Sequence, residues 1–373
     1  MKIAVNTRML LKGKMEGIGN FTYESMSRIA KAHQEHEFIF IFDRPFDESF
    51  IFSDNVTPVV AFPPARHPLL WYLWYEHALP RIFKNTKAEL FIATDGYLSV
   101  ASNMNSLAVI HDINFEHYPK DLPFFNRLFY KHYFPIYAQK AKRIAAVSEF
   151  TKNDVVDKYH IPSHKIDVVY NGVSEMFSPL SQEEIAKVRM QFSQGHPYFL
   201  FVGALHQRKN ISNMLKAFDE FKKSLSTPFK MILAGTKRWW TDEMENTYQK
   251  MQFKSDVIFT GHVSFDDLCR ITASALAMTY VSNFEGFGIP IVEAMKSGVP
   301  VITSNVTSMP EVAGDAAFLC DPFSVSSIAD GMKQVAINDV LRNGLIHRGL
   351  QRQADFSWDK TAIALWNSVE KTM

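Results

Sequence analysis

The sequence has few cysteines, no excess charge of either sign and no long apolar run. Its 373 residues include only Cys269 and Cys320, too few for a disulfide scaffold and without metal-ligand spacing, so we expect a reducing, cytoplasmic setting. Lys and Arg number 40 and Asp and Glu 39, a net charge of +1, so we expect no nucleic-acid partner. The most apolar run, 69–79, contains Glu76 and His77 and is shorter than the roughly 18 residues that span a bilayer. The chain also begins without a signal-peptide pattern. We expect a soluble protein, at most peripheral to a membrane.

Several catalytic motifs are missing as well. The sequence contains no Asp-x-Asp pair, no His-Glu-x-x-His, no Walker loop and no Gly-x-Ser-x-Gly elbow. Divalent cations are held by clustered carboxylates, so the absence of Asp-x-Asp predicts a reaction without a bound metal. We expect no metal site and no cofactor.

Short apolar runs alternate with helical stretches along the whole chain. This alternation is typical of parallel sheets that are covered by helices on both faces. The pattern restarts after the turn-rich stretch 171–179, so we expect two tandem Rossmann-like α/β domains with a ligand cleft between them. We predict an N-terminal domain over 1–175, a C-terminal domain over 176–356 and a last helix over 357–373 that packs back on the first domain. The predicted strands cover residues 3–6, 38–42, 56–62, 90–93, 107–110, 144–147, 168–170, 198–202, 229–234, 257–259, 275–281, 299–303 and 316–320.

The strongest motif follows the apolar run 275–281 and reads Glu285-Gly-Phe-Gly288-Ile-Pro-Ile-Val-Glu293. Pro290 suits the first turn of a helix and Gly298 its end, which predicts a helix over 289–297. A helix start with uncrowded N–H groups is a site for an anion. The two glutamates would accept hydrogen bonds from hydroxyl groups of the same ligand. The alternative is an ordinary helix start with a surface glutamate.

A second motif, Gly203-Ala-Leu-His-Gln-Arg208-Lys209-Asn210, follows the first strand of the second half. Arginine offers a planar fork and lysine a mobile point charge for phosphate oxygens. Next to the Glu285 loop, the pair would clamp a diphosphate, whereas on its own it would be a solvated loop. Because both residues are expected on a loop, we expect their substitution to leave folding intact.

The first half offers weaker signals. Glu16-Gly17-Ile18-Gly19 opens a helix, but it lacks the third glycine of a dinucleotide fingerprint, so it is a glycine-rich lip or a simple turn. His111 ends a strand, where it reaches a ligand or satisfies a structural hydrogen bond. Ser148 follows another strand and suits a helix N-cap.

Taken together, these motifs resemble the retaining nucleotide-sugar glycosyltransferases of family four, which have the two-domain GT-B fold. The resemblance covers the whole chain, and its most specific part is the Glu-x7-Glu string. It also includes Gly17-Ile-Gly19, Asn171-Gly-Val, Arg208-Lys209, Ser308-Met-Pro-Glu311 and Ser357-Trp358.

The resemblance implies a donor held mainly by the second domain and an acceptor held mainly by the first. Glu293 would bind the ribose hydroxyls and Glu285 would lie near the donor sugar. The resemblance implies that Arg208 and Lys209 neutralise the negative charge that grows on the leaving diphosphate, and that His111 forms a hydrogen bond with the sugar. The backbone at Gly17, Gly19, Gly203, Phe287, Gly288 and Ile289 would border the donor.

The motif string as a whole is similar to that of bacterial mannosyltransferases, so GDP-mannose is the first expected donor and UDP-linked glucose or N-acetylglucosamine the second. A nucleotide-sugar epimerase and a non-catalytic sugar-nucleotide-binding module are two further possibilities. The expected acceptor is a glycan, or a lipid-linked glycan, in surface polysaccharide synthesis. The aromatic run 69–75, flanked by Arg66 and Arg81, predicts either contact with a membrane surface or a buried core helix.

Overall fold

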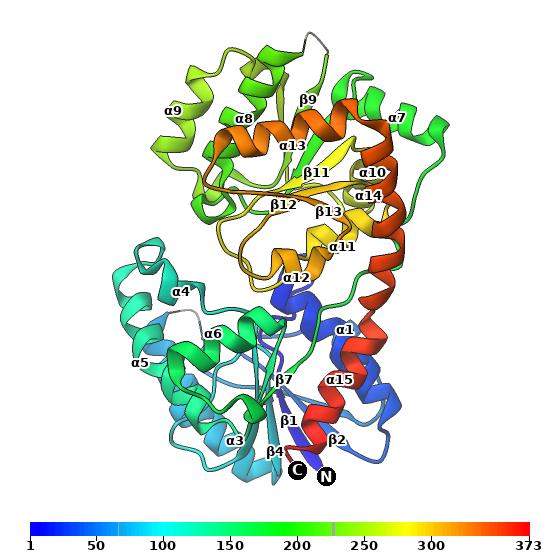
Figure 1. Ribbon diagram of the computed structural model, residues 1–373. Coiled ribbons are helices and arrows are strands. Elements are labelled where there is room, and N and C mark those ends of the chain that lie inside the picture. Colours follow the sequence, from blue (N-terminus) through cyan, green and yellow to red (C-terminus); the bar gives the residue numbers. More distant parts are fainter. Residues whose placement is uncertain (66, 226–227) are drawn as a thin grey trace. The chain divides into compact units, whose positions relative to one another are not determined.

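The chain folds into two compact units. The computed structural model describes residues 1–65, 67–225 and 228–373. Unit 1 comprises Met1–Gly172 and Trp358–Met373, and unit 2 comprises Val173–Ser357, so the chain passes between the units twice. Each unit is built around one parallel sheet with helices packed on it (Figure 1).

The seven strands of unit 1 lie in the order β3-β2-β1-β4-β5-β6-β7. The chain runs outward from β1 to β3 and then returns to β4 on the other side of β1. The point where the strand order reverses, between β1 and β4, is where ligands bind in sheets of this kind, beyond the carboxyl ends of the strands. The strands are β1 Lys2–Asn6, β2 Glu37–Phe42, β3 Val56–Val60, β4 Leu90–Ala93, β5 Asn105–Ile110, β6 Arg143–Ala146 and β7 Ile166–Val168.

The helices of unit 1 pack their apolar faces against this sheet. The run 69–75, predicted as either a membrane surface or a core helix, has a buried and an exposed side: Trp71, Trp74 and Tyr75 are buried, whereas Leu69, Tyr72 and Leu73 are exposed. The helices are α1 Gly17–Ala32, α2 Pro68–Leu73, the π-helical turn η2 Trp74–Ala78, α3 Leu79–Thr86, α4 Asn114–His117, α5 Phe124–Lys140, α6 Glu149–Tyr159 and α15 Trp358–Glu370.

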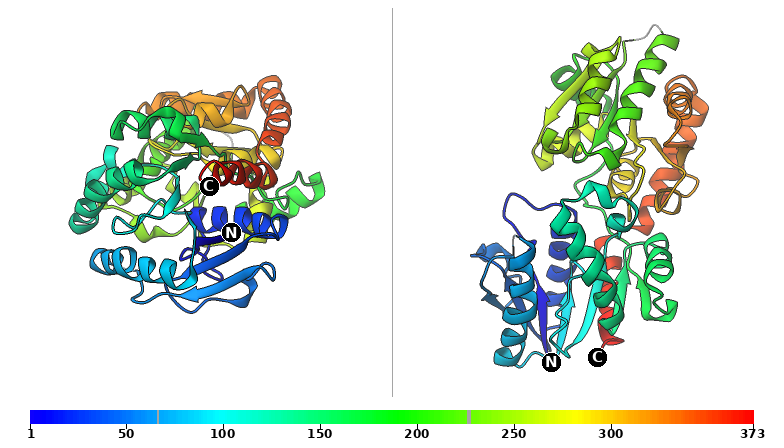
Figure 2. Two further views of the ribbon diagram at one scale, coloured as in Figure 1. Left: turned by 90° about the horizontal axis from the view of Figure 1, so that it is seen from below. Right: turned by 90° about the vertical axis from the view of Figure 1, so that its left-hand side faces the viewer.

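The last helix, α15, belongs to unit 1 although it follows unit 2 in sequence. It lies beside α1, as both views of Figure 2 show. The ring of Trp358 meets Phe21 edge-on at 6.3 Å, Arg28 Nε donates to Asp359 at 2.6 Å, and His33 stacks on Trp366 at 3.7 Å. Aromatic stacking and an ion pair therefore fix the C-terminal segment on unit 1.

Unit 2 repeats the same plan with six strands in the order β10-β9-β8-β11-β12-β13. Its strand order reverses between β8 and β11. The strands are β8 Tyr198–Val202, β9 Lys230–Ala234, β10 Val257–Gly261, β11 Ala277–Tyr280, β12 Val301–Ser304 and β13 Ala317–Cys320. The helices are α7 Gln182–Ser193, α8 Ile211–Ser224, α9 Asp242–Lys250, α10 Phe265–Ala273, α11 Ile289–Lys296, α12 Met309–Ala313, α13 Val325–Ile337 and α14 Asp339–Arg352.

All thirteen predicted strands coincide with strands of the structure, and the α/β fold class is confirmed. The least accurate prediction is that of β7, which is expected at 168–170 and lies at Ile166–Val168. Val169 continues the apolar run and is fully buried beyond the end of the strand, so the hydrophobic pattern extends past the ladder.

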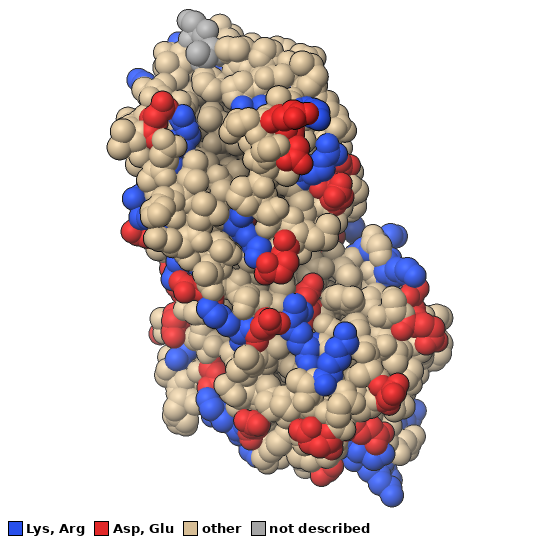
Figure 3. All heavy atoms as spheres, turned by 90° about the vertical axis from the view of Figure 1, so that its right-hand side faces the viewer, with Lys and Arg blue, Asp and Glu red and all other residues tan. Residues whose placement is uncertain are grey.

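The surface carries both charges in mixture. On the face shown in Figure 3, basic and acidic side chains alternate without a large field of one sign. Within the described residues, no helix is both long and apolar enough to cross a bilayer.

Candidate active site at the strand reversal of unit 2

The loop after β11 turns sharply into α11. Gly288 precedes the helix with φ 95°, a conformation that favours glycine, and Pro290 lies in the first turn. A Cβ on Gly288 would also come within 3.1 Å of Ile291 Cδ1. The helix predicted at 289–297 is found at Ile289–Lys296, so the backbone N–H groups of Gly288 and Ile289 stand at a helix start.

Two hydroxyls hold this loop in place. Ser308 Oγ donates to the carbonyl oxygens of Glu285 at 2.9 Å and Phe287 at 3.1 Å, and the Glu285 N–H donates to Thr307 Oγ1 at 3.3 Å. The Phe287 ring packs edge-on against Phe356 at 5.5 Å. The Ser308 motif was part of the family resemblance, but its task of bridging the Glu285 loop had no signal in the sequence.

Glu285 forms a buried ion cluster with the basic pair. Lys209 Nζ donates to Glu285 Oε1 at 2.6 Å and to Tyr280 Oη at 2.8 Å. Arg208 Nη1 donates to the carbonyl oxygen of Phe284 at 2.9 Å and lies 3.4 Å from Glu285 Oε2. Burial alone would raise the pKa of Glu285, but Lys209 and Arg208 outweigh it and lower that pKa to about 2. The carboxylate is therefore ionised at neutral pH.

The basic residues lie on a short 3₁₀ turn, Gln207–Lys209, rather than on a free loop. Asn210 follows with φ 61°, and its Nδ2 donates to the carbonyl oxygens of Val281 at 2.9 Å and Pro322 at 2.7 Å. The Asn283 N–H donates to the Arg208 carbonyl at 2.9 Å. The expectation that substitutions here leave folding intact is therefore revised, because removing Lys209 takes the closest cation from a buried carboxylate.

Glu293 differs from Glu285 in its surroundings. It projects from α11, and burial raises the pKa of its carboxyl to about 7. No donor or cation among the residues that the structure describes offsets that burial. A ligand with paired hydroxyl groups would supply the missing donors. Gly203, the other predicted site residue of unit 2, follows β8 with φ 139°.

The predicted residues of unit 1 follow its own strands. His111 comes after β5, and its Nε2 lies 2.9 Å from the Thr94 carbonyl oxygen, which can only accept, so Nε2 carries the proton. Burial lowers the pKa of His111, so the ring is neutral and Nδ1 is an acceptor. A Cβ on Gly17, which opens α1, would meet nothing within 4 Å, whereas a Cβ on Gly19 would lie 2.7 Å from the Met9 carbonyl oxygen.

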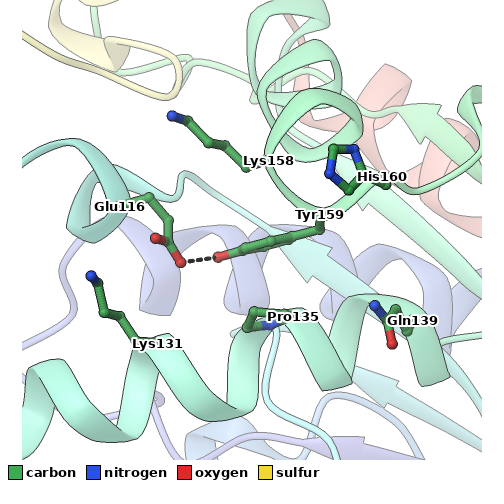
Figure 4. Close-up of a pocket in the computed structure, with 7 residues that line it drawn as sticks. All are labelled: Glu116, Lys131, Pro135, Gln139, Lys158, Tyr159 and His160. Carbon is green, nitrogen blue, oxygen red and sulfur yellow. Dashed lines mark hydrogen bonds between the residues drawn. The ribbon is translucent and has the colours of Figure 1, made fainter.

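Unit 1 also has two surface pockets that hold none of the predicted site residues. One, of about 360 Å³, lies among α4, α5 and α6, where Tyr159 Oη donates to Glu116 Oε1 at 3.0 Å between Lys131 and Lys158 (Figure 4). The other, of about 390 Å³, lies between α1 and α15. No group of three or more His, Cys, Asp or Glu side chains in the described ranges is arranged to hold a metal.

Two family models match the chain. The model "Glycosyltransferase Family 4" matches residues 15–175, and "Glycosyl transferases group 1" matches residues 182–352. The chain is a GT-B glycosyltransferase.

Known glycosyltransferases resemble it over most of their length. O-antigen chain mannosyltransferase B of Escherichia coli is 28% identical over 378 residues, covering 96% of this chain and 97% of that protein. The mannosyltransferase RfbU of Salmonella typhimurium is 28% identical over 72% of this chain and 71% of its own. Among solved structures, Anabaena HepE in complex with UDP and glucose has a TM-score of 0.77 at 16% identity, with 99% of each chain covered.

For this glycosyltransferase, unit 2 thus presents a cation pair, a helix start and a carboxyl without a donor among the described residues. Those are groups for phosphates and for hydroxyls. Unit 1 presents a neutral histidine acceptor at the end of β5.

Proposed function

We propose that the protein is a retaining mannosyltransferase that transfers mannose from GDP-mannose to a growing glycan in surface polysaccharide synthesis. The observation that carries the proposal is the Lys209–Glu285–Arg208 cluster at the strand reversal of unit 2. The choice of mannose rests on the printed names of the O-antigen mannosyltransferases that resemble the chain.

The charged and polar groups of the donor suggest where each part of it binds. Its diphosphate lies at the basic pair and at the start of α11, where Phe287, Gly288 and Ile289 line the turn, and Gly203 follows the adjacent strand β8. Its ribose hydroxyls donate to Glu293, whose charge no described residue offsets. Lys209 and Arg208 then divide their charge between the diphosphate and Glu285, and the sugar lies on the Glu285 side.

The transfer exchanges one bond at the anomeric carbon. The bond from this carbon to the diphosphate breaks, and the electron pair leaves with the diphosphate. A bond to an acceptor hydroxyl oxygen forms on the same face, and the hydroxyl proton passes to the leaving diphosphate. Arg208 and Lys209 stabilise the growing negative charge. Nδ1 of His111 accepts a hydrogen bond from the sugar. At α1, Gly17 leaves open space that would border the phosphates, whereas the space beside Gly19 is taken by the Met9 carbonyl.

A donor panel tests the proposal. The purified protein is incubated with an acceptor glycan and GDP-mannose, UDP-glucose or UDP-N-acetylglucosamine, and transferred sugar is measured by mass spectrometry. We expect transfer from GDP-mannose with retention of the anomeric configuration. Preferential transfer from a uridine donor would replace mannose in the proposal. Binding with no transfer would favour a sugar-nucleotide-binding module, and isomerisation of the free nucleotide sugar would favour an epimerase.

Transfer is expected to proceed without a divalent cation. The basic pair supplies fixed positive charge where a metal would otherwise meet the leaving diphosphate. The rate in excess EDTA should stay within about twofold of the rate without it. Loss of activity in EDTA that Mg²⁺ or Mn²⁺ restores would contradict this prediction.

The acceptor is proposed to be lipid-linked, with unit 1 touching the membrane surface. Three large apolar residues at the start of α5 are exposed: Phe124 by 58%, Phe125 by 67% and Leu128 by 50%. On the neighbouring α2, Leu69, Tyr72 and Leu73 are also exposed, and Trp71 packs on Phe129 of α5 at 5.3 Å. Arg127 lies over the Phe124 ring at 5.5 Å. Exposed apolar side chains beside a cation suit an anionic lipid surface. Arg66 lies outside the described residues.

Liposome flotation tests this contact. We expect the protein to float with vesicles of phosphatidylglycerol and phosphatidylethanolamine, and the variant Phe124→Ser/Phe125→Ser to stay largely in the bottom fraction. Val340→Ser removes an apolar side chain that is at least as exposed on unit 2 and should float as the wild type does. Equal flotation of the double variant and the wild type would place the contact elsewhere, and no flotation of the wild type would remove it.

A further inference from the structure

Two arginines stand at the carboxyl edge of the unit 1 sheet, and the reaction described above does not use them. Arg8 follows β1 by two residues, and Arg44 follows the adjacent β2 by two. β1 and β2 pair in register, Asn6 opposite Ile41. Arg8 lies at the strand reversal between β1 and β4, the place where a sheet of this kind binds a ligand.

A buried network orients the Arg8 guanidinium. Nε of Arg8 donates to Asp95 Oδ2 at 2.6 Å, and Asp95, directly beyond β4, also accepts from Asn6 Nδ2 at 2.8 Å and from Tyr75 Oη at 3.2 Å. The guanidinium carbon lies 4.8 Å from the centre of the Tyr97 ring. The planar group is therefore held by hydrogen bonds in its plane and by an aromatic ring against its face.

Arg44 is also held by a buried carboxylate. Its Nε and Nη2 donate to the two carboxylate oxygens of Asp43 at 2.5 and 2.7 Å. Ala65 joins the two pairs, because its N–H donates to Asp43 Oδ2 at 3.1 Å while its carbonyl oxygen lies 3.4 Å from Arg8 Nη1. One backbone residue thus ties both arginines into one edge of the unit.

In both pairs the aspartate lies inside and the arginine faces outward. The side chains of Asp95 and Asp43 are 1% and 0% exposed, whereas those of Arg8 and Arg44 are 11% and 26% exposed. Nη2 of Arg8 and Nη1 of Arg44 have no hydrogen-bond partner among the described residues. Buried carboxylates therefore hold two forks whose outer N–H groups remain available, the arrangement that bidentate recognition of an oxyanion needs.

The loops around the two arginines carry charges of both signs. The loop after Arg8 carries Lys12 and Lys14, and Lys12 pairs with Asp47 at 2.8 Å. Met9 places its carbonyl against Gly19 in the first turn of α1, so this loop lies on the helix start. α1 has no acidic residue in its first turn and no side-chain cap, and Glu16 before it is exposed.

We propose that Arg8 and Arg44 bind a phosphate group of the acceptor, such as the phosphate that joins a glycan to its lipid. The inference rests on the proposed glycosyl transfer and names the part of the acceptor that unit 1 holds. Two forks at one sheet edge give a tetrahedral oxyanion four or more N–H donors, more than a single carboxylate uses.

Arginine-to-lysine variants test this site, because lysine keeps the charge that pairs with each aspartate and loses the fork. Arg8→Lys and Arg44→Lys are assayed with two acceptors that carry the same glycan, one on an alkyl diphosphate and one on an uncharged alkyl chain. We expect KM for the diphosphate acceptor to rise roughly 10- to 100-fold. We expect kcat, KM for GDP-mannose and KM for the uncharged acceptor to stay within about twofold.

Arg143→Lys is the matched control. Arg143 makes the same two-pronged pair with Asp167, at 2.8 Å for both bonds, but it lies at the amino edge of the same sheet. The variant Arg143→Lys should therefore leave kcat and all three KM values unchanged. Should Arg8→Lys not fold, as judged by circular dichroism, the more exposed Arg44→Lys alone decides.

The outcomes separate the possible sources of the phosphate. An equal rise in KM for both acceptors, or no rise at all, would overturn the proposal. A rise in KM for GDP-mannose would assign the arginines to the donor diphosphate instead and would also overturn it. Equilibrium binding of the diphosphate acceptor without donor, compared between wild type and variants, stays decisive even if the wild type transfers no mannose. If the wild type transfers no mannose but still binds the diphosphate acceptor in a way that depends on the arginines, the proposed function would be wrong and the phosphate site would stand.

Discussion

Replacing Lys209 by methionine should lower kcat/KM for GDP-mannose by roughly a hundredfold or more. Lys209 supplies a charge that meets the leaving diphosphate, and the loss of one such interaction costs on the order of 2–4 kcal/mol in the transition state. The same change should lower the free energy of unfolding by roughly 3 kcal/mol, because it takes the closest cation, 2.6 Å away, from the buried Glu285 carboxylate. Steady-state kinetics and urea denaturation measure the two effects separately.

The control for this substitution is a second carboxylate with two cations in the same unit. Asp256 pairs with Lys222 at 2.9 Å and with Lys230 at 2.6 Å. The side chain of Lys222 is at least as buried as that of Lys209. Lys222→Met should lower stability by a similar amount and leave kcat/KM of the folded enzyme within about twofold. Equal losses of activity in Lys209→Met and Lys222→Met would show that Lys209 acts only through folding.

Replacing Glu293 by glutamine should stabilise the protein at high pH and weaken its binding of the donor. Burial raises the pKa of Glu293 from its ordinary 4.5 to about 7. Between these two values the unfolded chain loses the proton while the folded chain keeps it. Wild-type stability therefore falls as pH rises from 4.5 to 7, by roughly 3 kcal/mol in all, and stays low above pH 7.

Glu293→Gln lacks that ionisation. Its free energy of unfolding in urea should equal that of the wild type near pH 4.5 and exceed it by roughly 3 kcal/mol at pH 8. Calorimetry should show at least about tenfold weaker binding of GDP at pH 8, since a neutral amide replaces the carboxylate that accepts from two hydroxyls. Glu243→Gln, on the exposed first turn of α9, is the control and should change neither quantity. A variant that is no more stable than the wild type at pH 8 would contradict the shifted pKa.

Much of the fold could be predicted because buried parallel strands leave a local pattern. Each strand is a short apolar run, and the helix starts carry their own signals, such as Pro290 in α11 and Ser148, whose Oγ accepts from the Thr151 N–H as an N-cap. The motifs after β8 and β11 could also be placed on one edge, because adjacent parallel strands end together. The structure brings Arg208, Lys209 and Glu285 into contact as that argument requires.

Other features had no local signal. The Lys209–Glu285 pair joins residues 76 positions apart, and the Arg8–Asp95 pair joins residues 87 apart. Sequence patterns reveal which side chains follow a strand, but they do not reveal which of these side chains form ion pairs with one another. The aromatic run 69–75 shows the same limit, because its composition fits a membrane surface and a core helix alike. Only packing decides that Trp74 and Tyr75 are fully buried.

A crystal structure of the protein grown with GDP would test the central claim most directly. We expect the diphosphate at the carboxyl edge between β8 and β11, within hydrogen-bond distance of Lys209 Nζ and of the N–H groups at the start of α11. The ribose hydroxyls should donate to Glu293. A nucleotide bound away from this edge, with the Lys209–Glu285 pair and Glu293 untouched, would contradict the account.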